Sequence, residues 1–220
     1  MRRLTVRDVM TPDVVTVRVD ASFKEVARLL DENSVSALPV LDAEGRLAGV
    51  VSEADLLPKE EYRGVRARPR RLSSAARRQE TAKAAGDVAG DVMTASVVTI
   101  EPDAMLAEAA RAMVNKGVKR LPVVSVGGDL IGIVSRADLV RAFLRPDDAI
   151  AAEIEEELSN RVLLTERGDV TVRVVDGVVT LTGQLDRRSS IDIAEKVARE
   201  VDGVIDVKLE LSHRWDDSKL

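Results

Sequence analysis

The chain of 220 residues is 45% hydrophobic and 32% charged, with a formal net charge of −5, and this balance excludes global disorder. It contains no cysteine and one histidine, His213, which excludes disulfides, thiol nucleophiles and histidine-rich metal sites. The sequence shows neither a signal-peptide core nor the roughly 18–20 apolar residues of a membrane helix, so we expect a soluble, cytoplasmic protein.

The first feature along the chain is a duplicated unit. Residues 8–56 align with residues 91–139 at a constant offset of 83 without a gap, and 24 of the 49 aligned positions are identical. Three short motifs recur in both copies: D-V-M-T, L-P-V and, at the end, G-h-x-S-x-x-D, where h is hydrophobic. Such a repeat indicates two copies of one structural unit.

Each copy predicts the element order β-α-β-β-α. In the first copy these are a strand at 14–17, a helix after the capping box Ser22 and Glu25, strands at 37–41 and 47–51, and a short helix from Glu53. Pro39 indicates an edge or the start of a strand. One copy of about 50 residues is too small to bury its apolar strands alone. We therefore expect the copies to pack with pseudo-twofold symmetry and a ligand cleft between them.

The G-h-x-S-x-x-D motif has two interpretations. Ser52, and Ser135 in the second copy, falls between a strand and a helix, where a serine can cap the helix with an aspartate near its positive end. The same corner can instead bind a ligand, because its N–H groups and the serine hydroxyl can donate to a phosphate. Asp55 or Asp138 can only accept, which suits the two hydroxyl groups of a ribose.

On these motifs, residues 5–57 and 88–145 resemble a pair of CBS domains. The resemblance implies a compact module that binds AMP, ADP, ATP or S-adenosylmethionine in its clefts and forms a homodimer through its helices. It assigns the ribose to Asp55 and Asp138, the phosphate to Ser52 and Ser135, and the adenine to one strand in each copy, Val15, Thr16 and Val17 or Val98, Thr99 and Ile100.

The two predicted clefts differ in charge. Arg120 precedes the L-P-V motif of the second copy, where the first copy has Ala37, and Arg136 replaces Glu53 after the serine. In the family, a basic residue before this motif often contacts phosphate. We therefore expect the second-copy cleft to prefer a phosphorylated nucleotide, and the first to take an uncharged adenosine compound or stay empty. The residues assigned to the second cleft are Arg120, Pro122, Ser135, Arg136 and Asp138.

Residues 58–87 link the two copies. From Lys59 to Lys83 there are nine basic and three acidic residues, a local charge of +6. Ser73–Ala85 has few large apolar side chains to bury, so we interpret the segment as a solvated, partly disordered basic linker. The alternative is a phosphate-rich partner, either nucleic acid or an anionic membrane. Its one aromatic residue, Tyr62, is too few for stacking on single strands.

The C-terminal segment predicts the order αββαβ. The first helix has Ile150, Ile154 and Leu158 on one face. A hairpin follows, with strands at 170–175 and 178–182 joined by Asp176 and Gly177 and closed by Gly183. The second helix is capped by Gly203 and has an apolar face of Ile191, Ala194, Val197, Ala198 and Val201, and the last strand alternates Ile205, Val207, Leu209 and Leu211 with polar residues.

Residues 147–213 resemble a BON domain in the hairpin D-G-V-V-T-L-T-G and in V-D-G-V-I-D-V, and residues 214–220 form a tail. The resemblance implies an interaction domain with a phospholipid or protein partner. The predicted fold class is thus α+β, with two β-α-β-β-α repeats and a small αββαβ domain.

Together these features predict a non-enzymatic sensor that needs no cofactor. It binds an adenosine ligand in the paired repeats and transmits the bound state to the BON domain. The alternative is a membrane- or partner-docking adaptor that acts through the BON domain and the basic linker, with clefts that are only structural. An enzyme is disfavoured because the sequence shows no nucleophile–base grouping and no spare catalytic domain.

Overall fold

The structure is a computed structural model that describes residues 3–61, 83–163 and 169–217. The chain forms two compact units, one of residues 10–135 and one of residues 1–9 with 136–220. Within the described ranges, none of the helices combines the length and the apolar character needed to cross a membrane.

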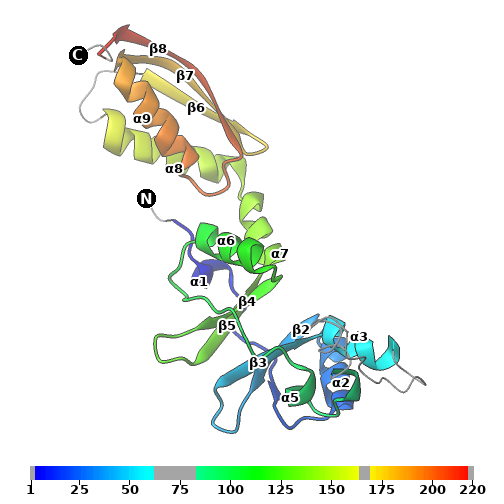
Figure 1. The fold of residues 1–220 in the computed structure, drawn as a ribbon. Helices are drawn as coiled ribbons and strands as arrows, with labels where there is room; N and C mark the ends of the chain where they lie inside the picture. Colours follow the sequence, from blue (N-terminus) through cyan, green and yellow to red (C-terminus); the bar gives the residue numbers. More distant parts are fainter. Residues whose placement is uncertain (1–2, 62–82, 164–168, 218–220) are drawn as a thin grey trace, which may run out of the picture. The chain divides into compact units, whose positions relative to one another are not determined.

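The unit of residues 10–135 contains the first copy of the repeat from Met10 onward and the second copy up to the end of its last strand (Figure 1). The first copy has β1 (Val17–Arg18), α2 (Phe23–Glu32), β2 (Ala37–Leu41), β3 (Leu47–Ser52) and α3 (Glu53–Glu61). The second has α5 (Ala89–Val92), α6 (Leu106–Lys116), β4 (Arg120–Val124) and β5 (Leu130–Ser135). In the first copy β1 is parallel to β2, and β2 is antiparallel to β3. The second repeats the antiparallel pair, and a parallel bridge from Ile100 to Val123 replaces the first strand.

The two copies complete each other's sheets. Thr94 of the second copy exchanges backbone hydrogen bonds with Val50 in β3, at 2.9 and 3.1 Å. Thr11 of the first copy does the same with Ile133 in β5, at 2.9 and 3.0 Å. Because both partners are related by the offset of 83 residues, the exchange is reciprocal, and the predicted pseudo-twofold packing is confirmed.

This exchange explains why a glycine opens the G-h-x-S-x-x-D motif. A Cβ on Gly132 would lie 2.6 Å from Sδ of Met10 and 3.1 Å from the carbonyl oxygen of Thr11. Gly49 faces the side chain of Met93 in the same way. The methionine of each D-V-M-T motif therefore packs on the glycine of the other copy.

The first copy differs from the prediction in its strands. Only Val17 and Arg18 of the first strand pair in a sheet, and β2 is the central strand, so Pro39 does not mark an edge. The proline is tolerated there because β1 pairs only with Val40 and Leu41. The capping prediction is confirmed in part, since the Ser22 hydroxyl accepts the N–H of Glu25 at 3.2 Å.

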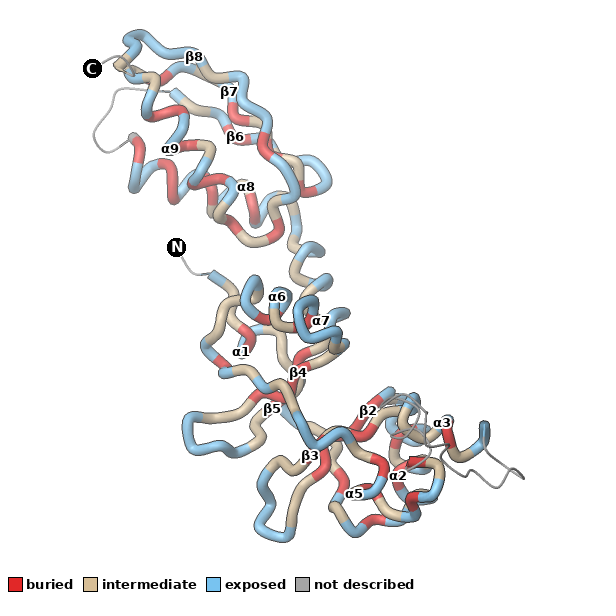
Figure 2. The backbone as a smooth tube through the Cα atoms, in the orientation of Figure 1, coloured by how far each residue is buried: buried red, intermediate tan, exposed pale blue. Residues whose placement is uncertain are grey.

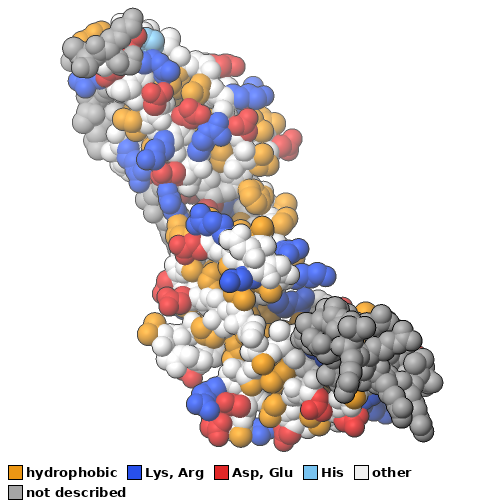
Figure 3. Space-filling model, viewed as in Figure 1, with side chains coloured by type: hydrophobic (Ala, Val, Ile, Leu, Met, Phe, Trp, Pro, Cys, Tyr) orange, Lys and Arg blue, Asp and Glu red, His pale blue; other side chains and the backbone are white. Residues whose placement is uncertain are grey.

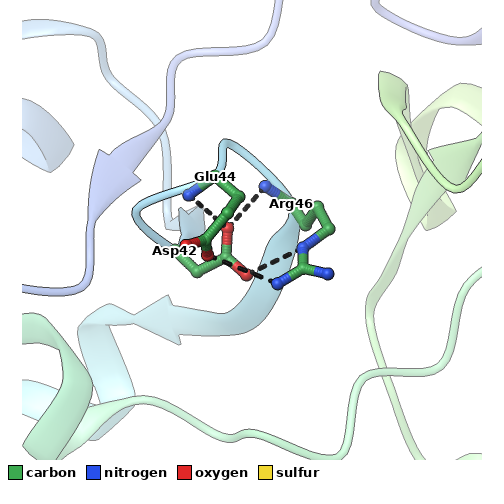
Figure 4. Close-up of polar contacts among 3 residues, drawn as sticks. All are labelled: Asp42, Glu44 and Arg46. Atoms are coloured by element: carbon green, nitrogen blue, oxygen red, sulfur yellow. Dashed lines mark hydrogen bonds and ion pairs between the residues drawn. The ribbon is translucent and has the colours of Figure 1, made fainter.

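Asp42 orders the turn between β2 and β3 (Figure 4). Its Oδ1 accepts the backbone N–H groups of Arg46 (2.8 Å) and Glu44 (3.0 Å), and its Oδ2 accepts Nε of Arg46 at 3.2 Å. The backbone N–H of Arg46 is the main cause that lowers the pKa of Asp42 below its ordinary value of 3.8. The carboxylate therefore stabilises the fold above its unfolded pKa, and this stabilisation is lost as the pH falls through the lowered value.

The other unit contains the αββαβ domain, whose predicted order is confirmed (Figure 1). Its elements are α8 (Asp147–Leu158), β6 (Asp169–Val175), β7 (Val178–Arg187), α9 (Arg188–Arg199) and β8 (Asp206–Trp215); α1 (Val6–Val9) and α7 (Arg136–Arg141) also belong to this unit. The central strand β7 is antiparallel to β6 and parallel to β8. Both long helices cover one face of the sheet, and the predicted helix residues, from Ile150 to Val201, are buried between them (Figure 2).

The outer surface of α9 is solvated. Arg188 pairs with Asp192 at 3.1 Å, and Arg199 pairs with Glu195 at 2.9 Å, both at i,i+4 spacing. Figure 3 shows acidic and basic side chains interspersed over this domain, without a large area of one sign on the face in view.

Several details of this domain correct the prediction. Strand β7 does not close at Gly183 but continues to Arg187, and Gly203 is not the helix cap, which is Glu200. In the last strand only Val207 is buried among the four predicted apolar positions, and Ile205 is 62% exposed.

The predicted tail also contains structure. Strand β8 runs to Trp215, and both carboxylate oxygens of Asp217 accept hydrogen bonds from Ser189, at the start of α9. These contacts hold the pKa of Asp217 below its ordinary value.

Candidate functional site

A cavity of about 350 Å³ lies between the two copies in the unit of residues 10–135. The first copy contributes the start of β2 and the corner where β3 passes into α3. The second contributes the segment 94–98 and the start of β4. The polar residues that line the cavity are Ser36, Ser52, Glu53, Asp55, Thr94, Ser96, Lys119 and Arg120. The apolar part includes Val97, Val98 and Pro122.

Asp55 is the most tightly held polar residue of the cavity. Its Oδ2 accepts both the backbone N–H of Ser52 (2.8 Å) and the Ser52 hydroxyl (2.7 Å). The aspartate therefore reaches back to cap the start of α3, as the third residue of a capping box does. Because both donors of Ser52 point at Asp55, neither is directed at a phosphate in this structure.

Lys83 completes the contacts of Asp55. Its Nζ forms an ion pair with Oδ1 of Asp55 and a hydrogen bond of 3.3 Å with Oγ1 of Thr94. The Lys83 side chain is only 10% exposed and that of Asp55 17% exposed. This pair thus joins the first copy to the D-V-M-T segment of the second at the edge of the cavity.

Arg120 brings a second cation to the cavity. Its Nη2 donates to the hydroxyl of Ser36. Partial burial lowers the pKa of Arg120 below its ordinary value, and the Glu53 carboxylate acts in the opposite direction. The guanidinium stays charged at neutral pH, because arginine is not deprotonated in proteins.

The structure brings together Ser52, Asp55, Arg120 and Pro122, but in a grouping that the sequence did not predict. The backbones of Arg120 and Ser135 are paired in the β4–β5 ladder, yet the Arg120 side chain reaches Ser36 and the corner of the first copy. The prediction assigned Arg120 to a separate second-copy cleft, whereas the structure places its side chain in the same cavity as Glu53.

Other predicted site residues do not line this cavity: Thr16, Val17, Thr99, Ile100, Ser135, Arg136 and Asp138. Arg136 and Asp138 belong to the other compact unit, where Asp138 pairs with Arg141 at 3.1 Å. A second ligand site at Ser135 stays a prediction.

Lys83 contacts two residues of the cavity lining, Asp55 and Thr94, but is absent from the site residues predicted from the sequence. It was placed in the solvated linker, yet its side chain is buried. Residues 62–82 of that linker lie outside the described residues, whereas 58–61 belong to α3. The signal available in the sequence was the short distance of Lys83 from the D-V-M-T motif, which folds back onto the first copy.

The duplicated halves and the cavity between them define a paired α/β module followed by a separate αββαβ domain. The model of the CBS domain matches residues 6–60 and 88–145, and the model of the BON domain matches residues 146–212. The chain belongs to the CBS-domain family and carries a BON domain after its CBS pair.

Two similar proteins match about two thirds of the chain. The chain is 32% identical over 155 residues to an uncharacterized protein of Methanocaldococcus jannaschii, MJ1426, covering 64% of this chain and 92% of that protein. It is 35% identical over 152 residues to the chloroplastic CBS domain-containing protein CBSX2 of Arabidopsis thaliana, with 64% of each chain covered.

Two solved structures share the fold. The crystal structure of CBSX2 in complex with AMP is 36% identical, has a TM-score of 0.56 and covers 64% of this chain and 97% of that one. The CBS pair of MJ0100, in complex with 5′-methylthioadenosine and S-adenosyl-L-methionine, has a TM-score of 0.52 and covers 64% of this chain and 97% of that one. At 21% identity, the latter likeness shows the fold alone.

Proposed function

We propose that this protein is a non-enzymatic sensor that binds an adenosine nucleotide in the cavity around Asp55. The observation that carries the proposal is that one cavity combines an acceptor suited to ribose hydroxyls, Asp55, with two cations suited to phosphate, Lys119 and Arg120. The AMP complex of CBSX2, a relative with 36% identity, supports this choice.

The cavity suits one nucleotide. Its volume of about 350 Å³ falls within the range of small-molecule sites. The apolar surface of Val97, Val98 and Pro122 suits the flat adenine base, whereas the carboxylate and the cations suit the sugar and the phosphate. A nucleotide bound with its base on the apolar residues and its sugar and phosphate on the charged residues would contact both parts of the cavity lining.

The charges favour AMP, ADP or ATP over S-adenosylmethionine. Lys119 and Arg120 line the cavity with Lys83 beside it, against the carboxylates of Glu53 and Asp55. A phosphate is attracted by this excess of cations, whereas the positively charged sulfonium group of S-adenosylmethionine is not.

The proposed output is the BON domain. The cavity takes its lining from both copies, so a bound nucleotide contacts both and favours the arrangement to which it binds best. We propose that this preference changes how the protein presents its BON domain to a phospholipid or protein partner, and that two chains associate through the CBS pair.

Replacing Arg120 by alanine tests the proposal. We expect the Kd for AMP, measured by isothermal titration calorimetry, to rise about tenfold to a hundredfold, because a charge-assisted hydrogen bond contributes about 1.5–3 kcal/mol. Arg141→Ala is the matched control, since Arg141 is 70% exposed and does not line the cavity. An unchanged Kd for Arg120→Ala would contradict the assignment of the phosphate.

A further inference from the structure

Lys83 belongs to neither copy of the repeat, but its ammonium group lies at the most buried polar point of the site. It contacts Asp55 and Thr94, both of which line the cavity, and it comes from the chain that precedes the second copy. A lysine with an almost fully buried side chain is unusual, because burying its charge is costly unless the charge is paired.

The hydrogen bonds of Asp55 limit how a ribose can bind. Each carboxylate oxygen has two acceptor positions. Oδ2 already accepts the N–H and the hydroxyl of Ser52, and Oδ1 accepts Nζ of Lys83. Among the contacts of the described residues, one acceptor position therefore remains on Oδ1, whereas the two neighbouring hydroxyls of a ribose offer two donors.

Lys83 can satisfy the second hydroxyl. An ammonium group has three N–H donors. Among the described residues, two of them are directed at Asp55 and Thr94. The third can donate to a hydroxyl oxygen, since a hydroxyl accepts as well as donates. The pair of Asp55 and Lys83 is then complementary to a diol, with one acceptor and one donor.

The backbone on either side of Lys83 holds it in place. The carbonyl oxygen of Lys83 accepts the N–H of Gly86 at 3.1 Å, and Nζ of Lys59 in α3 donates to the carbonyl oxygen of Gly86 at 2.5 Å and to Asp87 at 2.8 Å. A Cβ on Gly86 would lie 2.7 Å from Cβ of Asp91, so this turn is tightly packed. These contacts hold the backbone at Lys83 and do not involve Asp55.

We infer that Lys83 is a specificity-determining residue that contacts the sugar of the nucleotide. One ribose hydroxyl donates to Oδ1 of Asp55, and the neighbouring hydroxyl accepts from Nζ of Lys83. The inference rests on the proposed function and adds to it the selection of ribose over deoxyribose by this lysine.

The test is calorimetry on the full chain with AMP, 2′-deoxy-AMP and 3′-deoxy-AMP. We expect Lys83→Met to weaken AMP binding about tenfold. One of the two deoxy analogues lacks the hydroxyl that faces Lys83. For this analogue we expect Lys83→Met to change the Kd less than about twofold, because the hydrogen bond between Nζ and that hydroxyl cannot form even in the unaltered protein. Lys83→Arg keeps the charge and the donors and should retain AMP binding.

Lys116→Met is the matched control, because Lys116 is an exposed lysine at the end of α6 and is not part of the cavity lining or of the turn that holds Lys83. If Lys83→Met does not fold, the double variant Asp55→Asn with Lys83→Met removes both charges and the Nζ donor together and should bind AMP and one of the deoxy analogues equally well.

Three results would overturn the inference. If Lys83→Met binds AMP as tightly as the unaltered protein, the lysine does not contact the sugar. If the variant binds AMP more tightly, the lysine competes with the sugar for Asp55. If it weakens all three nucleotides by the same factor, the lysine acts only on the fold. Failure of the unaltered protein to bind any of the three would instead refute the proposed function itself.

Discussion

Replacing Asp55 by alanine is expected to weaken AMP binding at least about a hundredfold and to lower the free energy of unfolding of the CBS pair by about 2 kcal/mol. Binding suffers because the acceptor for the ribose is gone. Stability suffers because Ser52 loses the acceptor of its N–H and hydroxyl, and the ammonium group of Lys83 loses its counter-charge while its side chain is 10% exposed. Calorimetry and urea unfolding measure the two effects separately.

Asp87→Ala is the matched control for this prediction. Asp87 is also paired to a lysine, Lys59, and this pairing lowers its pKa, but its side chain is 87% exposed and does not line the cavity. We expect this variant to bind AMP normally and to unfold at the same urea concentration as the unaltered protein, because exposed ion pairs contribute little to stability. Normal AMP affinity in Asp55→Ala would show that the carboxylate only caps the helix.

Replacing Gly183 by alanine is expected to destabilise the BON domain by about 3 kcal/mol. Gly183 has φ +138°, a conformation that side chains rarely adopt, and a Cβ there would overlap the carbonyl oxygen of Asp169 in the neighbouring strand. We expect amides in β6, β7 and β8 to lose protection in hydrogen exchange. The Kd for AMP should stay within about twofold, since the cavity is formed by residues 36–122 of the other unit.

Gly127→Ala provides the comparison for this variant. The nearest side-chain atoms to a Cβ on Gly127 lie at 3.4 and 3.5 Å, an ordinary contact, so we expect a change within about 0.5 kcal/mol. If Gly183→Ala left the exchange of β6–β8 unchanged, the strand geometry described for this position would be wrong.

The sequence predicted correctly those features that depend on nearby residues in the chain, namely the order of the elements and the buried faces of the helices. The element order followed from the offset of 83 residues and the apolar spacing, and the helix residues from Ile150 to Val201 are buried as predicted. The hairpin turn at Asp176 and Gly177 was also predictable, since both residues have positive φ, which the type of turn requires.

The composition of the site was less predictable, because it depends on which copy contributes each wall. The Arg120 side chain reaches across to Ser36, and Thr94 pairs with Val50, so residues more than 40 positions apart meet at one cavity. Aligning the motifs by repeat suggests one group of site residues in each copy. In the structure, the D-V-M-T segment of each copy pairs with the last strand of the other, so one cavity contains residues from both copies. Lys83 was missed for the same reason, since no repeat motif contains it.

In the C-terminal domain, the errors come from contacts between strands. An alternating pattern predicts one buried face, but only Val207 is buried, whereas Ile205, just before β8, is 62% exposed and Leu209 is 38% exposed. Gly183 looks like the end of a strand from its residue type alone. Its pairing with Val170 inside the β6–β7 ladder follows only from the register of the sheet.

A crystal structure of the protein with AMP is the most direct test of the binding site. The account predicts a nucleotide between the two copies, with its ribose at Asp55 and Lys83 and its phosphate at Lys119 and Arg120. AMP bound elsewhere, or a cavity filled by the protein's own side chains at saturating AMP, would contradict it.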